Sequence, residues 1–193
     1  IANTGKPTFL STGGANKEEI RWALEKFLAN GGKKITLLQT TAKYPAPIDS
    51  LNLKAMIDLY NEFKEFDIDV GLSDHSNYQK DKLNILKWAV CTGIKFVERH
   101  FTVIEKDKSR DGIVSLNPEE MKEAVAICNW TDEAKTSFVE KNYQQKDIVM
   151  GDKNRELSDI ELLNRDYYQG RVASRSLNGD VIYNWDDRFS SND

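Results

Sequence analysis

The sequence predicts an α/β fold in which parallel β-strands alternate with helices. Four short apolar runs occupy residues 8–10, 35–38, 68–72 and 94–97, and each precedes a segment with apolar residues at helical spacing. The strand–helix unit recurs about every 25–30 residues, which indicates parallel strands joined by crossover helices. The runs are apolar throughout and do not alternate, which is typical of strands buried on both faces.

The expected helices carry their own start and stop signals. The first begins after Asn16, with Glu19 three residues later in a capping-box pattern, and ends at Asn30-Gly31-Gly32. The second and third are expected at about residues 52–66 and 78–91. The fourth begins at Asn117, which is followed by Pro118 in the first helical position.

The number of units limits the architecture. Four units are too few to close a (β/α)₈ barrel, which takes roughly 250 residues, so they fit half of a TIM-type barrel or a small open sheet. The first turn, Ser11-Thr-Gly-Gly14, lacks the GxGxxG pattern, so a dinucleotide site is weakly supported. The pattern fades from about residue 131. We therefore predict a half-barrel over residues 1–130 and a linker with a short C-terminal appendage over 131–193. The appendage should contain a helix near 158–168 and a hairpin around Asn178-Gly179.

Composition excludes several classes of partner. The net charge is −4 and the pI is near 5.4, which argues against a nucleic-acid or membrane-surface footprint. No apolar run approaches the roughly 20 residues that span a bilayer, and the first residues do not resemble a signal peptide. Cys91 and Cys128 are not in CxxC spacing, so we expect reduced thiols and a cytoplasmic protein.

Polar residues follow each apolar run, where parallel folds build their active sites. Both histidines of the chain, His75 and His100, stand three residues beyond the third and fourth runs. On adjacent strands the two imidazoles could bind one divalent ion, and with oxygen ligands they suit Mn²⁺, Fe²⁺ or Zn²⁺. Simpler explanations exist for each candidate residue. A histidine can be structural, Ser11 and Ser73 can cap helices, Glu98 can form a buried ion pair, Tyr44 can anchor its loop, and Asp111 can be a solvated charge.

Four segments also resemble those of a known enzyme family. Lys6-Pro-Thr-Phe-Leu-Ser-Thr-Gly13, Tyr44-Pro-Ala-Pro47, Gly71-Leu-Ser-Asp-His75 and Glu98-Arg-His-Phe-Thr102 are similar, in order and spacing, to segments of N-acetylneuraminate (sialic acid) synthases and their legionaminate and pseudaminate relatives. Asp111-Gly-Ile-Val-Ser-Leu-Asn-Pro118 extends the match. The tail Gly170-Arg-Val-Ala-Ser-Arg-Ser-Leu177 resembles the start of the family's antifreeze-like domain.

The resemblance implies strands five to eight of the barrel and a role for each candidate residue. His75 and His100 would be metal ligands, commonly for Mn²⁺, with Mg²⁺ or Co²⁺ as alternatives. Glu98 would be the carboxylate beside the metal, which makes Glu98 and the two histidines the catalytic group. The substrate-binding positions would be Ser11, Tyr44 and Ser73 for phosphoenolpyruvate and Asp111 for the amino-sugar.

The implied reaction condenses phosphoenolpyruvate with N-acetylmannosamine or a related amino-sugar aldehyde and releases phosphate. The implied assembly is a homodimer, or a complement to an N-terminal half-barrel. The chain departs from the family at Gln39-Thr-Thr-Ala42, where His-Cys-Thr-Asn is usual, and at Lys108-Ser-Arg-Asp111, where Pro-Gly-Pro-Asp is usual. Two alternatives stay open: an inactive or incomplete synthase remnant that binds a sugar or phosphate ligand, and a different barrel aldolase that uses phosphoenolpyruvate or pyruvate.

Overall fold

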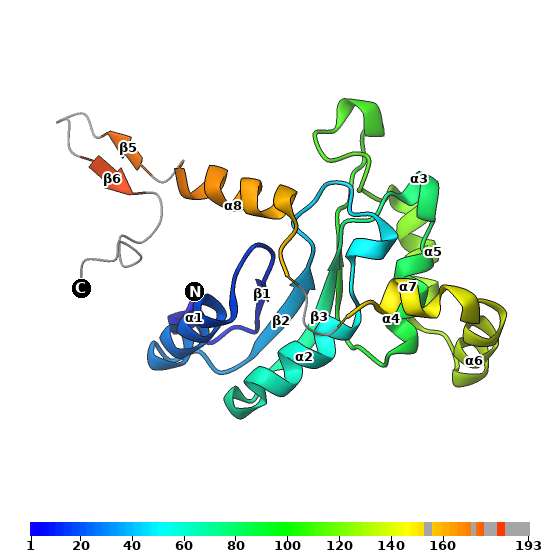
Figure 1. Ribbon diagram of the computed structural model, residues 1–193, viewed down its shortest axis with the longest axis horizontal. Helices are drawn as coiled ribbons and strands as arrows, with labels where there is room; N and C mark the ends of the chain where they lie inside the picture. Colours follow the sequence, from blue (N-terminus) through cyan, green and yellow to red (C-terminus); the bar gives the residue numbers. More distant parts are fainter. Residues whose placement is uncertain (153–155, 171–172, 176–180, 184–193) are drawn as a thin grey trace. The chain divides into compact units, whose positions relative to one another are not determined.

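The computed structural model describes residues 1–152, 156–170, 173–175 and 181–183 (Figure 1). The chain divides into two compact units, Ile1–Glu156 and Leu157–Asp193. The first unit contains a parallel sheet with its helices, and the second contains a helix and a two-stranded hairpin. All seven candidate site residues lie in the first unit.

Four parallel strands in chain order form the sheet of the first unit. They are β1 (Thr8–Ser11), β2 (Ile35–Thr40), β3 (Asp69–Asp74) and β4 (Val97–Arg99). β1 to β3 coincide closely with the predicted runs, whereas β4 begins three residues after residue 94. The shift occurs because Ile94 packs into the apolar core beneath the helices and does not join the ladder.

The sheet is strongly curled. Phe9 lies on β1 and Phe96 immediately precedes β4, at opposite sides of the four-stranded sheet, yet their ring centroids are 5.3 Å apart. In a flat sheet the outer strands would be about 14 Å apart, given a spacing of about 4.8 Å between neighbours. The curl gives the sheet a concave and a convex face. The predicted α/β half-barrel is therefore confirmed, while the position of its strands within a whole barrel stays a prediction.

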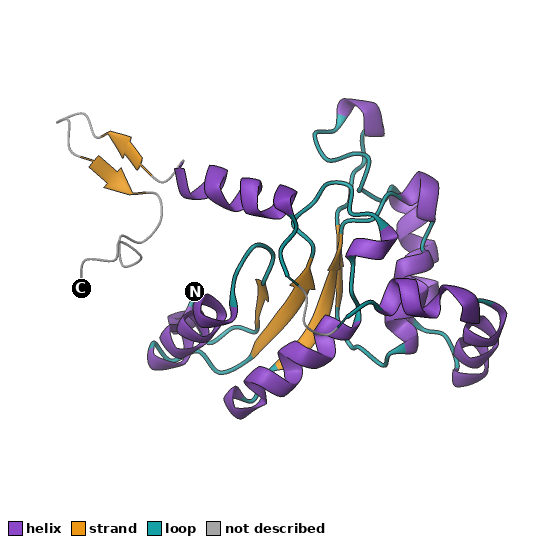
Figure 2. Ribbon diagram, viewed as in Figure 1, coloured by secondary structure: helices purple, strands orange, loops and turns teal. Residues whose placement is uncertain are grey.

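Helices cover the convex face (Figure 2). They are α1 (Lys17–Ala29), α2 (Lys54–Phe63), α3 (Tyr78–Asp81), α4 (Asn84–Cys91) and α5 (Pro118–Cys128). Both predicted helix starts are confirmed, because Asn16 and Asn117 each form a capping box with the glutamate three residues later. The helix expected over residues 78–91 is divided in two at Lys82, which has a positive φ of 52°.

The apolar core lies between the convex face and these helices. Leu37 of β2 packs with Leu24 of α1 and Phe63 of α2, and all three side chains are buried. Leu72 of β3 packs in a second cluster with Trp88 of α4. Each such side chain contributes about 1.5–3 kcal/mol when it is removed from water. This packing fixes the strands from behind and leaves the concave face for the candidate site.

Residues 131–152, which the sequence suggested as a linker, contain two further helices. These are α6 (Asp132–Lys141) and α7 (Lys146–Met150). The ring of Phe138 contacts Trp88 at 5.2 Å between centroids, and Val149 is fully buried in the same cluster. Their apolar positions are few and separated by charged residues, so helical periodicity in the sequence is weak here. Short 3-10 helices occupy Ala2–Thr4, Ile48–Ser50, Lys64–Phe66, Lys106–Lys108 and Tyr143–Gln145.

The second unit begins with α8 (Asp159–Gly170). The backbone N–H and hydroxyl of Ser158 both donate to Glu161 Oε2, at 3.0 and 2.9 Å, and the first of these bonds is one half of a capping box. β5 (Ala173–Arg175) and β6 (Val181–Tyr183) form an antiparallel pair. The expected turn at residues 178–179, and half of the antifreeze-like segment 170–177, lie outside the described residues. Within the described residues, no helix is both long and apolar enough to cross a bilayer.

Candidate functional site

A row of polar side chains crosses the concave face near the carboxyl ends of the strands. Ser11 of β1 donates its hydroxyl to Thr40 Oγ1 of β2 at 2.8 Å. Thr40 is in register with Ser73 of β3, and Ser73 with Glu98 of β4. The Ser73 hydroxyl donates to Glu98 Oε1 at 2.7 Å. This polar row of Ser11, Thr40, Ser73 and Glu98 brings three of the predicted site residues together.

His75 lies directly beyond this row and is held in one tautomer. Its Nδ1–H donates to the carbonyl oxygen of Thr41 at 2.9 Å, which leaves the lone pair of the neutral ring on Nε2. Ser73 Oγ lies 3.4 Å from Nε2, but its single proton is donated to Glu98. Burial lowers the pKa of His75 below its ordinary value, while the Thr41 carbonyl raises it and a charge on His100 lowers it. The ring therefore presents an unprotonated nitrogen to the site.

His100 lies beside His75, as the matched strand ends predicted. The two ring centroids are 5.2 Å apart with an interplanar angle of 78°. Tyr44 packs over both rings: it stacks on His75 at 4.2 Å between centroids and meets the edge of His100 at 5.8 Å. The loop that carries Tyr44 is tied to this place by a hydrogen bond from Ala46 N–H to the His75 carbonyl oxygen, 2.9 Å long. Tyr44 thus contacts both histidines of the candidate site.

Asp111 reaches the site on a long loop that follows β4. Its Oδ2 lies 3.8 Å from His100 Nδ1, which is an electrostatic contact longer than a hydrogen bond. The loop returns to its starting point, because Leu116 N–H donates to the His100 carbonyl and Thr102 N–H donates to the Leu116 carbonyl. These two hydrogen bonds close the loop next to His100 and bring Asp111 to the histidine pair.

The donor set fits a divalent cation. His75 Nε2 has its lone pair available, and a carboxylate beside His100 Nδ1 matches the outer-shell carboxylate that orients many ligating imidazoles. In the part of the chain that the structure describes, no group of three or more His, Cys, Asp or Glu side chains could hold an ion. The chain would therefore supply two nitrogen ligands and leave the other positions to oxygens of water or substrate, as in catalytic sites with open coordination.

Comparison with known proteins identifies the family. The family model described as NeuB matches residues 1–140. The chain belongs to the NeuB family. It is 43% identical over 124 residues to N,N'-diacetyllegionaminic acid synthase of Campylobacter jejuni, an alignment that covers 63% of this chain and 35% of the relative. It is 29% identical over 185 residues to a pseudaminic acid synthase of the same species, with 95% of this chain and 47% of the relative covered.

A solved structure agrees with these matches. The crystal structure of the spore coat polysaccharide biosynthesis protein SpsE from Bacillus subtilis aligns with a TM-score of 0.65 at 26% identity. That alignment covers 91% of this chain and 46% of SpsE. The chain therefore spans about a third to a half of the length of the NeuB relatives that it matches.

The structure adds residues to this candidate site that the sequence analysis missed. Thr40 completes the polar row and Thr41 fixes the tautomer of His75, although neither was singled out by residue type. The strand-end pattern contained a usable signal, because alternation places Thr40 on the same face as Leu38 and hence on the concave side. The buried ion pair considered for Glu98 is absent from the described contacts of that residue, which is exposed and accepts from Ser73.

A groove of about 560 Å³ runs along β4, the outermost strand at one side of the described sheet. Its lining combines Phe9 and Phe96 from the concave face with Leu86 of α4 and Met121 of α5 from the helix layer. It thus wraps around the open side of β4. Phe9 is 51% exposed, which is unusual for a phenylalanine on the inner face of a barrel-like sheet. Neither histidine lines the groove, whereas Glu98 of the polar row does.

Proposed function

We propose that this chain forms the metal-binding, sugar-facing half of a cytoplasmic synthase that condenses phosphoenolpyruvate with N-acetylmannosamine or a related amino-sugar aldehyde and releases phosphate. The enzyme would be a carbon–carbon bond-forming transferase of sialic acid biosynthesis. The observation that carries the proposal is that the rings of His75 and His100 lie next to the polar row with their centroids 5.2 Å apart. The names of the relatives, which are synthases of legionaminic and pseudaminic acid derivatives, support the reaction class.

His75 and His100 would hold the cation, for which we propose Mn²⁺ with Mg²⁺ or Co²⁺ as substitutes. Bound there, the ion supplies Lewis-acid polarisation of the aldehyde. Thr41 keeps His75 in the ligating tautomer through its carbonyl oxygen. Tyr44 would hold the two rings in place by its contact with both of them.

The remaining site residues have roles that follow from their positions. In the reaction, C3 of phosphoenolpyruvate bonds to the aldehyde carbon, whose oxygen takes up a proton and becomes a hydroxyl. Water then adds at C2, and phosphate leaves as the C2–O bond breaks. Glu98 would accept the proton of that water, and the hydrogen bond from Ser73 would orient its carboxylate. Ser11, at the other end of the polar row, would bind the phosphoenolpyruvate carboxylate. Asp111, beside His100, would bind the sugar.

We further propose that the chain works together with an N-terminal half-barrel, in the same polypeptide or another subunit, and that the complete enzyme is a homodimer. The exposed ring of Phe9 and the groove along β4 support this, because a closed barrel would cover both. Cations for the phosphate group would then come from the other half. The match of the chain to less than half of each relative supports the same division.

The test is a phosphate-release assay on the chain combined with an N-terminal half of a NeuB-family synthase, using Mn²⁺, phosphoenolpyruvate and N-acetylmannosamine. We expect phosphate release that depends on both substrates and on the metal. Glu98→Gln, which keeps size and removes the base, should lower the rate by about 10²–10⁴-fold. Unchanged phosphate release in Glu98→Gln would contradict the proposed role of Glu98. If the wild type releases no phosphate with N-acetylmannosamine or with legionaminate- or pseudaminate-type sugar precursors, the proposed reaction is contradicted.

A second candidate function is ligand binding without turnover. It is favoured by Ala42, which stands where related synthases usually have an asparagine. Ala42→Asn separates the two functions: a gain of phosphate release in that variant, with none in the wild type, would identify the natural chain as a remnant. We propose catalysis as the first candidate because His75 and His100 lie side by side next to Glu98 and Ser73.

A further inference from the structure

A buried ion pair stands directly behind the two histidines. Asp74 immediately precedes His75, Arg99 immediately precedes His100, and the two are register partners on β3 and β4. Their side chains form an ion pair and are only 1% and 5% exposed. Alternation along the strands places this pair on the convex face and the imidazoles on the opposite side. The pair therefore lies next to both histidines in sequence without facing the metal space.

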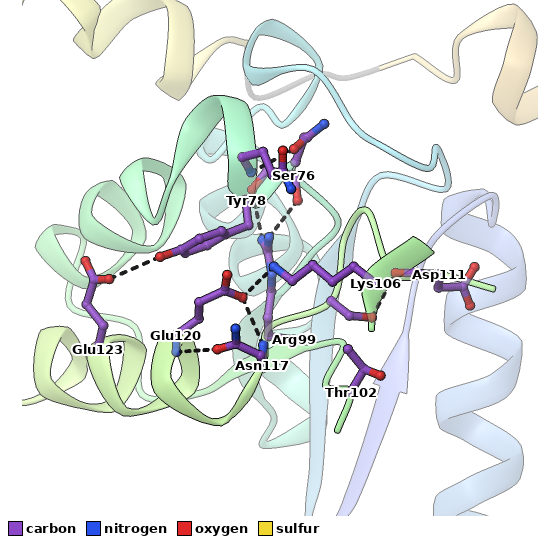
Figure 3. A network of polar contacts seen from close by, with 12 residues as sticks. Ser76, Tyr78, Arg99, Thr102, Lys106, Asp111, Asn117, Glu120 and Glu123 are labelled. Carbon is purple, nitrogen blue, oxygen red and sulfur yellow. Dashed lines mark hydrogen bonds and ion pairs between the residues drawn. The ribbon is translucent and has the colours of Figure 1, made fainter. Parts of the chain in front are cut away.

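Arg99 also donates hydrogen bonds to Ser76, the residue that follows His75 (Figure 3). Its Nη1 donates to Ser76 Oγ at 2.8 Å and its Nη2 donates to the Ser76 carbonyl oxygen at 2.6 Å. Asp74 Oδ1 accepts from Ser76 N–H at 2.8 Å. The guanidinium of Arg99 thus contacts the residues before and after His75, while the backbone of Arg99 continues directly into His100. The geometry of the planar fork allows these contacts to form at once.

Stability alone does not account for this arrangement. Removing two charges from water is costly, and apolar residues of similar size often serve a fold equally well. Arg99 Nε makes no hydrogen bond within the described part of the chain, which adds to the cost. What the pair does provide is a fixed alignment of the ends of β3 and β4, where the two imidazoles emerge.

We infer that Arg99, with Asp74 and Ser76, is a positioning residue that sets the separation and orientation of the His75 and His100 rings. The expected effect of Arg99 on metal binding rests on the proposed function, whereas its expected effect on the geometry of the two rings does not. Arg99→Lys retains the charge, but a single ammonium cannot reach Asp74 and both Ser76 atoms in the same arrangement. The separation and orientation of the two rings should then no longer be fixed, while the packing of the core around them is retained.

Two measurements test this on the full chain. Calorimetric titration with Mn²⁺ alone should show affinity about 10- to 100-fold weaker in Arg99→Lys than in wild type, the range for residues that orient metal ligands. In the metal-free protein, the nuclear Overhauser contact between the carbon-bound ring protons of His75 and His100 should weaken or vanish. The chain has only two histidines, so the spectrum of a single His100→Ala variant assigns both rings.

The control is Arg21→Lys, because Arg21 forms surface ion pairs with Glu62 and Glu65 on the helices and should leave both signals unchanged. The double variant Asp74→Leu/Arg99→Met removes both charges together, so it leaves no buried charge unpaired. It should fold, and it should lose the ring contact too. Wild-type ring contact in both folded variants would overturn the inference. Absence of Mn²⁺ binding in the wild type would instead contradict the proposed function, while the ring contact would still decide the positioning role.

Discussion

Lys106 should stabilise the loop that carries Asp111, and its loss should be costly. Its ammonium forms an ion pair with Glu120, with both side chains mostly buried at 19% and 14% exposure, and lies 4.5 Å from the centroid of the Tyr78 ring (Figure 3). The Lys106 backbone also touches the next turn of the loop, since a Cβ on Gly112 would meet the Lys106 carbonyl oxygen. Lys106 thus connects α3, α5 and the loop.

The magnitude follows from these contacts. A partly desolvated cation–π contact contributes about 1 kcal/mol, and breaking a mostly buried ion pair adds about 1–2 kcal/mol. Glu120 keeps its hydrogen bond from Asn117 N–H, which limits the cost of leaving its charge unpaired. We therefore expect Lys106→Met to lower the free energy of unfolding by about 2–3 kcal/mol, or about 4–12 °C in melting temperature for a chain of this size.

The assay is urea unfolding of the full chain, with hydrogen exchange of residues 107–115 measured in parallel. Lys108→Met is the matched control, because Lys108 pairs with Glu105 in the same loop but both side chains are about two-thirds exposed. Its loss should cost at most about 0.5 kcal/mol. Equal unfolding free energies for the two variants, or unchanged exchange of the loop in Lys106→Met, would refute this account of how Asp111 is held.

Three further predictions follow from the concave face. Gly71→Ala should lower the unfolding free energy by about 1–3 kcal/mol in urea titration, because its Cβ would lie 2.5 Å from the Phe96 carbonyl oxygen; a neutral effect would show that β3 and β4 can separate. Phe9→Ser should barely change the stability of the chain but weaken its binding to an N-terminal half-barrel in sedimentation experiments, and unchanged binding would contradict the proposed closure. Ser73→Ala should lower phosphate release about tenfold by freeing the Glu98 carboxylate, whereas an unaltered rate would remove Ser73 from the site.

Much of the fold could be predicted because its signals are local. The capping boxes at Asn16 and Asn117 mark helix starts through residues three positions apart, and both form as expected. The break at Lys82 could not be predicted, because it depends on how Leu83 and Leu86 pack beneath α5 and not on any helix-breaking residue. Tertiary packing also explains why residues 131–152 are helical despite weak periodicity.

The site divides in the same way between local and distant contacts. The matched positions of His75 and His100 beyond neighbouring strands predicted that the two rings lie close together, because this depends only on strand register. The hydrogen bond between Ser73 and Glu98 depends on the same register but was not predicted. The carbonyl of Thr41 and the fork of Arg99 could not be found in this way. Thr41 is 34 residues from His75 in the sequence and acts through its backbone carbonyl, which no side-chain pattern marks. The guanidinium of Arg99 contacts Asp74 and two atoms of Ser76, and this arrangement is visible only in three dimensions.

The most direct test of the central claim is a calorimetric titration of the metal-free chain with Mn²⁺, repeated on His75→Ala and His100→Ala. We predict one bound ion per chain in the wild type and a loss of binding in each variant, because the chain offers two nitrogen ligands at this place. Affinity that is the same in all three proteins would show that the paired imidazoles do not hold the cation, and the proposed function would lose its basis.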